Sequence, residues 1–212
     1  MGDETPEDQL RPLTPVLLTL QGKPQVVIVA SGIGVNPEGV QGFDPADGKR
    51  IWWCKGAGDA SSPAFGGGIL YTDSGRGGGG TAFDPTGEGD LSGKIKWTVG
   101  GLSEAIGSPI ILGDHVYRLQ NPGVLRVWNV SDGQETDKQR LGVSSTWASP
   151  IADGDGRIYF ASGGKSVVVQ SGAQVKILAT NDLGDPNHAS PAVSKGRLYI
   201  AGLKNLYCIG AK

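Results

Sequence analysis

The sequence has little of what helical, membrane-spanning or nucleic-acid-binding proteins need. No segment approaches the run of about 18 apolar residues that a membrane helix requires. Charged residues make up 19% of the 212 residues, and 19 basic against 21 acidic side chains leave a net charge of −2. A basic surface for nucleic acid or an anionic membrane is therefore not expected. The two cysteines, Cys54 and Cys208, are too few for a disulfide scaffold or a four-cysteine metal site.

Apolar residues at helical spacing are also missing. No stretch places them at i, i+3, i+4 and i+7 through three turns without an intervening Gly or Pro. Glycine is abundant, with 36 residues, and 38% of the chain is hydrophobic, in short clusters rich in Val, Ile and Leu. Such clusters argue against disorder and favour short strands separated by turns. We therefore predict an all-β protein.

The first residues carry no recognisable targeting signal. The sequence MGDETPEDQLRPLTPVLLTL opens acidic and contains three prolines, so it lacks the basic start and apolar stretch of a secretion signal. We expect residues 1–13 to form an extended segment ahead of the folded part.

A recurring dipeptide divides the rest of the chain into repeats. Five Ser-Pro or Thr-Pro pairs recur at spacings of 48, 46, 41 and 41 residues, with their prolines at Pro15, Pro63, Pro109, Pro150 and Pro191. After each of the last four prolines comes a turn glycine and then an apolar segment ending in tyrosine, at Tyr71, Tyr117, Tyr159 and Tyr199. Further apolar segments end at turns such as Phe43-Asp44-Pro45 and Phe83-Asp84-Pro85.

Each repeat reads as four strands separated by Gly, Pro, Asp, Asn and Ser turns. Four strands in just over 40 residues is the arithmetic of a β-propeller blade, a small twisted sheet that packs against its neighbours. A leucine-rich repeat, with one strand in about 20–29 residues, does not fit this period.

These motifs resemble the pyrroloquinoline-quinone-type β-propeller repeat, over about residues 14–212. The likeness is carried by phrases such as Asp44-Pro45-Ala46-Asp47-Gly48-Lys49-Arg50-Ile51-Trp52 and Asn205-Leu206-Tyr207-Cys208-Ile209-Gly210. It is strongest to bacterial exported proteins, which implies a periplasmic or secreted location and a larger ring of seven or eight blades. We expect about five four-stranded blades in this chain, near residues 14–61, 62–107, 108–148, 149–189 and 190–212.

The resemblance also implies how the blades meet. Trp52 and Trp97 fit the position of a tryptophan that docks between neighbouring blades, whereas Lys138 or Gln139 and Leu178 stand near that position in the third and fourth repeats. Contacts there are expected to be aliphatic or weaker. The last repeat stops before an outermost strand, so its third strand is predicted to be an uncharged edge, prone to self-association.

Motifs for catalysis or cofactor binding are weak. The quinone-dependent dehydrogenases of this family use two adjacent cysteines, and here Cys54 and Cys208 stand far apart in the sequence, so no cofactor is expected. Gly163-Gly164-Lys165-Ser166 is interpreted as a hairpin turn, and residues 77–80, four glycines, as a flexible connection. Residues 153–157 echo half of a calcium loop without its later acidic ligand, so no metal is predicted. His115 and His188 stand alone, and we predict no catalytic residue.

The loops that enter each inner strand are the best place for function, because rigid scaffolds present function on loops. We predict a non-catalytic binding or scaffolding propeller that engages a protein or a carbohydrate-like ligand, with no nucleic-acid partner. The alternative is an enzyme, a hydrolase or a degenerate quinoprotein, with its site at the channel mouth. Trp147 is either an interface anchor or inter-blade packing. The candidate binding residues are Asp59, Glu104, Arg118, Trp147, Asn187 and His188.

Overall fold

The computed structural model describes residues 14–30, 39–56, 58, 60–143 and 147–210, and these form short strands joined by turns and loops. The helical element in these ranges is the three-residue 3₁₀ turn η2 (Ser92–Lys94). No helix in the same ranges is long and apolar enough to cross a membrane. The prediction of an all-β chain is confirmed. The strands form five sheets within two compact units, residues 1–102 and 103–212.

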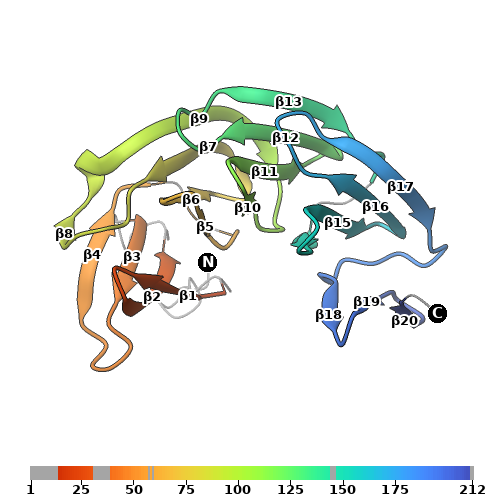
Figure 1. Ribbon diagram of the computed structural model, residues 1–212, viewed down its shortest axis with the longest axis horizontal. Helices are drawn as coiled ribbons and strands as arrows, with labels where there is room; N and C mark the ends of the chain where they lie inside the picture. Colours follow the sequence, from red (N-terminus) through yellow and green to blue (C-terminus); the bar gives the residue numbers. More distant parts are fainter. Residues whose placement is uncertain (1–13, 31–38, 57, 59, 144–146, 211–212) are drawn as a thin grey trace, which may run out of the picture. The chain divides into compact units, whose positions relative to one another are not determined.

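The first unit contains two sheets (Figure 1). In the first, four strands are antiparallel neighbours in chain order, as expected for a blade. They are β1 (Val16–Leu20), β2 (Lys23–Ala30), β3 (Gly39–Phe43) and β4 (Arg50–Cys54). The second sheet has the order β5-β6-β7-β9. Its strands are β5 (Ala64–Gly66), β6 (Ile69–Asp73), β7 (Arg76–Phe83) and β9 (Ile95–Glu104).

Two features of this unit differ from the sequence prediction. The glycines at positions 77–80 lie within β7 rather than in a flexible connection. A Cβ at Gly80 would lie 2.3 Å from the hydroxyl oxygen of Tyr71, so this glycine lets the tyrosine ring cross the strand. In addition, β8 (Gly89–Asp90), from the second repeat, pairs in parallel with β4 and gives the first sheet a fifth strand.

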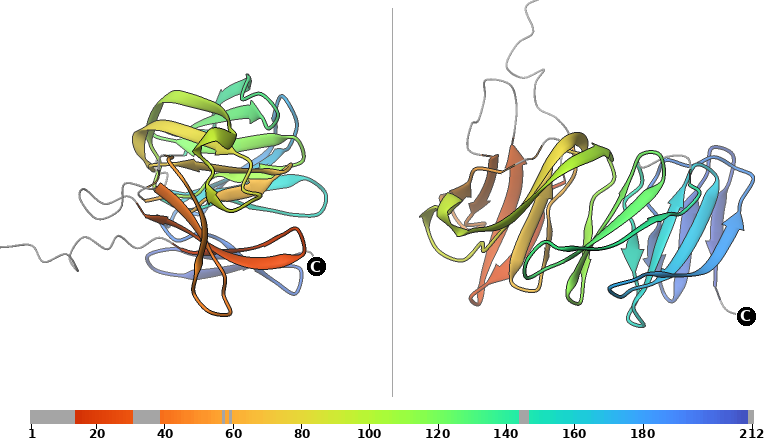
Figure 2. Two further views of the ribbon diagram at one scale, coloured as in Figure 1. Left: turned by 90° about the vertical axis from the view of Figure 1, so that its left-hand side faces the viewer. Right: turned by 90° about the horizontal axis from the view of Figure 1, so that it is seen from above.

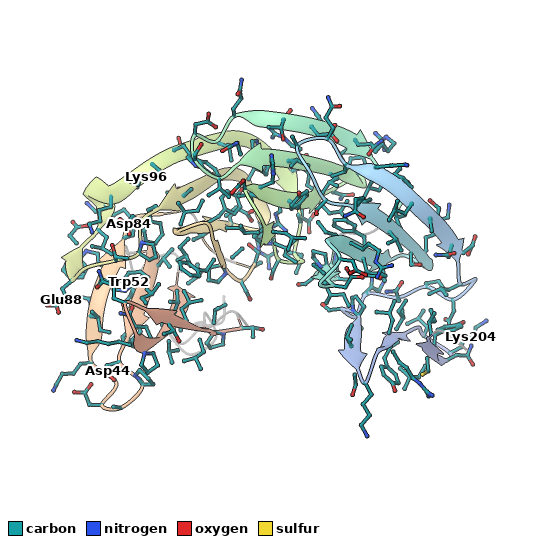
Figure 3. The ribbon with its side chains drawn as sticks, viewed as in Figure 1. Asp44, Trp52, Asp84, Glu88, Lys96 and Lys204 are labelled. Atoms are coloured by element: carbon teal, nitrogen blue, oxygen red, sulfur yellow. The ribbon has the colours of Figure 1, made fainter. Side chains whose placement is uncertain are left out.

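Trp52 holds the two sheets of the first unit together, as the resemblance implied. The side chain on β4 is fully buried, and its indole N–H donates to Oε1 of Gln25 at 2.7 Å (Figure 3). Its ring meets Phe83 of the second sheet edge to face, with 5.8 Å between centroids. Leu70 of the second sheet and Leu91 belong to the same apolar cluster. An aromatic side chain of this size contributes a large apolar area to the contact.

The second unit contains three sheets, and Figure 2 shows the third and fourth as twisted sheets. The third consists of β10 (Ile110–Leu112), β11 (His115–Gln120), β12 (Val124–Asn129) and β13 (Glu135–Arg140). The fourth consists of β14 (Ile151–Ala152), β15 (Arg157–Ser162), β16 (Lys165–Gln170) and β17 (Lys176–Asp182). The fifth has three strands in the described residues, β18 (Ala192–Ser194), β19 (Arg197–Ala201) and β20 (Leu206–Ile209).

The third and fourth sheets share one apolar core that contains no tryptophan. Tyr117, Leu125 and Val127 of the third sheet pack with Phe160 and Val167 of the fourth. Most of this cluster is Leu, Val and Ile, as expected for the third repeat, which lacks the docking tryptophan. At the edge of this core, Gly172 of the fourth sheet's loop donates its N–H to the Tyr117 hydroxyl at 2.8 Å.

The recurring Ser-Pro pairs have a structural explanation. The Ser108 backbone N–H donates to the Ser149 hydroxyl, and the Ser149 N–H donates to the Ser190 hydroxyl, both at 2.9 Å. Each serine thus links the start of one inner strand to the start of the next. The proline that follows has no N–H to satisfy at this position. The short inner strand then begins directly after it, as β10, β14 and β18 do.

The turns between the third and fourth strands share the same side-chain hydrogen bond. The side-chain oxygens of Asp44, Asp84 and Asn129 each accept the N–H of the residue two positions later, at 2.8 to 2.9 Å. Asp44 and Asp84 are labelled in Figure 3. Short polar side chains favour such turns because they replace a backbone acceptor. This chemistry accounts for the Phe-Asp-Pro phrases in the sequence.

Candidate functional site

The loops that enter the inner strands lie beside the hairpins between second and third strands. Ala60 donates its N–H to the Ser74 carbonyl at 2.8 Å in the second sheet, and Leu203 donates to the Pro186 carbonyl at 3.0 Å in the fifth. In the third sheet the Asn121 N–H donates to the Glu104 carbonyl at 2.8 Å. Loops and hairpins therefore gather at the same end of each of these sheets, where a binding surface was predicted.

Asp185 is the central anchor of the loop that enters the fifth sheet. Its side chain is 2% exposed, and its carboxylate accepts N–H groups from Leu203, Lys204 and Asn205 at 2.9 to 3.2 Å. Burial raises the pKa of this carboxyl, but the N–H donors of Lys204 and Asn205 and the Tyr207 hydroxyl lower it by more. The net pKa therefore lies below the ordinary value of an aspartate. The ionised carboxylate holds the β19–β20 hairpin against the entering loop.

Asp185 was not among the predicted site residues. Its sequence signal was ambiguous, because Asp-Pro also occurs at positions 44–45 and 84–85, where it only makes a turn. Only the tertiary contacts with the hairpin distinguish it.

Asn187 was predicted as a binding residue, and the structure places it inside the protein. It is 1% exposed, its amide donates to the Ala161 carbonyl at 2.9 Å, and its Oδ1 accepts the Gly164 N–H at 3.1 Å. Its own carbonyl accepts the Gly163 N–H at 2.9 Å. The Gly163-Gly164 pair is the two-residue hairpin turn expected from the sequence, since Ser162 pairs with Lys165. Asn187 therefore positions the surface and does not form part of it.

Arg118 is also buried, with 2% of its surface exposed. Its guanidinium donates to the backbone carbonyls of Ala105 and Gly107 in the loop that enters the third sheet. Arg118 fixes that loop, whereas Glu104, the last residue of β9 just before it, is exposed. Asp59, another predicted binding residue, lies outside the described residues.

Trp147 and His188 form an exposed pair, which we call the aromatic pair. Trp147 is 59% exposed, and its ring centroid lies 5.9 Å from that of His188, which is also exposed. The two residues come from the loops that enter the fourth and fifth sheets. Of the predicted site residues, these are the two that the structure brings together at the surface.

Leu203 and Lys204 add an exposed apolar and an exposed basic side chain at this end of the fifth sheet. Leu203 is 74% exposed at the β19–β20 hairpin, and Lys204 beside it is exposed (Figure 3). The hairpin is tied to Pro186, two residues from His188. Sequence reasoning missed both residues, because a Gly-Leu-Lys-Asn turn carries no signal beyond that of a hairpin.

In residues 153–157, which resemble half of a calcium loop, donors of the chain itself bind the Asp153 carboxylate. The Asp153 carboxylate accepts the Arg157 guanidinium at 2.7 Å and the Tyr159 hydroxyl at 2.8 Å. Burial raises the pKa of Asp153, but the Arg157 backbone N–H, the Tyr159 hydroxyl and the guanidinium lower it to about 2. No three His, Cys, Asp or Glu side chains gather as a metal site would need, in the part of the chain that the structure describes.

The residues present do not fit a quinone held by a cysteine ring. Cys54 and Cys208 are free thiols, Cys54 buried on β4 and Cys208 exposed on β20. They are not adjacent in sequence, so they cannot form the ring that adjacent cysteines make.

A family model and several solved structures match most of the chain. A family model described as outer membrane protein assembly factor BamB matches residues 36–211. The crystal structure of BamB from Moraxella catarrhalis is similar at a TM-score of 0.65 and 17% identity, covering 90% of this chain and 58% of that chain. The present chain thus spans less than two thirds of that one. No curated protein matches the sequence.

Two computationally designed proteins are also similar in fold. Ika8 matches at a TM-score of 0.64 and 13% identity, covering 91% of this chain and 57% of the designed one. Ika4 matches at 0.52 and 15% identity, covering 74% of this chain and 97% of that chain. At these identities the likenesses bear on the fold, and they support a β-propeller built from repeated four-stranded sheets.

Proposed function

We propose that this chain, which belongs to the BamB family of outer membrane protein assembly factors because residues 36–211 match that family's model, is a non-catalytic scaffold that binds a protein partner. The family description places its members' work at the outer membrane, so we propose a periplasmic location. The observation that carries the proposal is the exposed aromatic pair, Trp147 with His188.

The surroundings of this pair support a binding role. Tryptophan is enriched among residues that dominate protein interfaces, because it buries a large apolar area and keeps a polar N–H at its edge. Asn187 and Asp185 are almost fully buried, and their hydrogen bonds fix the backbone next to the pair. A rigid loop loses little conformational entropy on binding, which favours affinity.

The enzymatic alternative gains no specific support. The carboxyls of Asp153 and Asp185 have lowered pKa values, and both are held by donors of the chain itself. A general acid at neutral pH needs a raised pKa. A carbohydrate-like ligand would also stack on Trp147, but the family supports a protein.

We predict that Trp147→Ala and His188→Ala weaken partner binding more than they lower stability. Each removes an exposed ring, so the melting temperature should change little, while a hot-spot truncation weakens binding by about tenfold or more. The measurement is capture of detergent-extracted outer-membrane proteins on the immobilised chain, with the captured proteins identified by mass spectrometry.

The matched control is Phe65→Ala, which removes a 37% exposed aromatic ring from β5. Capture of assembly proteins that Phe65→Ala preserves and Trp147→Ala abolishes supports the proposal. Capture unaffected by both loop variants, or a melting temperature lost together with binding, would place these residues in packing and overturn it.

A further inference from the structure

Two hairpins flank the loop that carries His188. On one side, the β15–β16 hairpin donates two backbone N–H groups to Asn187, one to its carbonyl and one to its side chain. On the other side, the β19–β20 hairpin donates the Leu203 N–H to the Pro186 carbonyl. These bonds hold the loop to both hairpins, so His188 is presented between them.

Each of these hairpins carries an exposed lysine. Lys165 is the first residue of β16, directly after the turn, and Lys204 lies in the β19–β20 hairpin. The fifth repeat packs its entering loop on the β15–β16 hairpin, yet Lys165 remains exposed. Two cationic side chains therefore lie on either side of the loop that carries His188.

In the described residues, neither lysine has an acidic partner. No carboxylate forms an ion pair with the ammonium group of Lys165 or of Lys204. At the other end of β15, by contrast, Arg157 is paired with Asp153 and Asp155. The two lysines thus leave an uncompensated positive charge beside the aromatic pair.

The two acidic residues nearest in the structure are engaged elsewhere. Asp182 lies opposite Lys165 on β17, and its carboxylate accepts the Gly184 N–H at 2.8 Å. Asp185 is 2% exposed, and its carboxylate is surrounded by backbone N–H donors of the β19–β20 hairpin. A buried carboxylate held in this way presents little negative charge to a partner.

We propose that the aromatic pair and these two lysines bind an acidic segment of a protein partner, one that also carries a large apolar side chain. This inference rests on the proposed function and names the chemistry of the partner. Carboxylates of such a segment would pair with the two ammonium groups, and its apolar side chain would pack on the 59% exposed Trp147. The charges supply specificity, since a basic segment would bring like charges together, and the buried ring supplies most of the affinity.

Fluorescence anisotropy of labelled synthetic peptides tests the inference. The probe peptide alternates aspartate with phenylalanine. One control peptide has lysine in place of aspartate, and another has serine in place of phenylalanine. The probe should bind more tightly than either control, and its affinity should fall as salt rises from about 50 mM to about 500 mM, because salt screens exposed charges.

Charge reversal identifies the residues that bind the probe. Lys165→Glu combined with Lys204→Glu should weaken its binding by about tenfold, because two attractions become repulsions. The matched control combines Lys138→Glu with Lys176→Glu, the same change in net charge at exposed lysines of β13 and β17, and should bind as the wild type does. Trp147→Ala should also weaken binding. Circular dichroism checks that every variant is folded.

Three results would overturn the inference. They are equal binding of the acidic and basic peptides, equal binding by the two double variants, and lysine-dependent binding to phosphatidylglycerol vesicles without binding of the probe, which would indicate a membrane-binding surface instead. Each leaves the proposed function standing if Trp147→Ala still abolishes capture of outer-membrane proteins. Capture that does not depend on Trp147 overturns the proposed function itself.

Discussion

At the scale of single residues, burial separates the groups that build this protein from those that face a partner. Asp185, Asn187 and Arg118 are polar residues at loops, yet each is almost fully buried and bonded to backbone groups. A buried polar group costs free energy unless it is hydrogen-bonded, so these side chains fix loop geometry. Trp147 and His188 are exposed and remain the candidates for binding.

We expect Asp153→Asn to change the response of the protein to acid. The pKa of Asp153 is lowered in the folded state to about 2, against about 3.9 for an unfolded aspartate. The ionised carboxylate therefore stabilises the fold above about pH 4, and this contribution is lost as the pH falls toward 2. In urea titrations monitored by fluorescence, the stability gap between wild type and Asp153→Asn should close over that interval. Asp155→Asn, whose side chain is 77% exposed, is the matched surface control.

At the scale of strands and turns, close approaches decide which substitutions the sheets accept. Gly42 on β3 lies under the ring of Trp52, where a Cβ would come within 2.3 Å of a ring carbon. Gly100 on β9 has no atom within 4 Å of the same position. Both glycines lie in strands, so only the packed neighbour distinguishes them.

Gly42→Ala should therefore destabilise the protein, by about 1–3 kcal/mol, because it overpacks the contact with Trp52. Gly100→Ala should leave stability unchanged or slightly raised, since it removes only backbone freedom in the unfolded chain. Chemical denaturation of the two variants beside the wild type measures the difference. Equal stabilities would show that the Trp52 ring moves aside freely.

At the scale of the whole chain, repetition provides both the fold and the surfaces. Within each unit, one sheet is joined to the next by a tryptophan, by aliphatic residues or by serine hydroxyls. The family match covers residues 36–211, and a shared fold does not by itself imply a shared cofactor.

We predict that pyrroloquinoline quinone with calcium does not bind and supports no dye reduction. The reason is the missing pair of adjacent cysteines, since Cys54 is buried and Cys208 lies on a different strand. Isothermal titration of the purified chain with quinone and calcium, followed by a dye assay with an alcohol, is the measurement. Saturable binding accompanied by dye reduction would refute the prediction.

The sequence by itself determined the fold class and the punctuation of the repeats. Local rules were sufficient there, because strand periodicity, Asp and Gly turns and Ser-Pro pairs act over a few residues. The turn at Gly163-Gly164 was predicted on this basis, whereas the place of Trp52 at the contact between sheets was implied by the resemblance to the propeller repeat, and the structure confirms both. The four glycines in β7 were misread, since glycine runs usually mark connections and only the neighbouring strands hold this one extended.

Only the tertiary structure decided which loop residues are buried and which are exposed. Asn187 and His188 are adjacent in sequence, but the first bonds to Ala161, 26 residues away, and the second lies beside Trp147. Likewise, the parallel pairing of β8 with β4 joins segments of different repeats. Burial depends on contacts between residues distant in the chain, and no local pattern of residue types specifies those contacts.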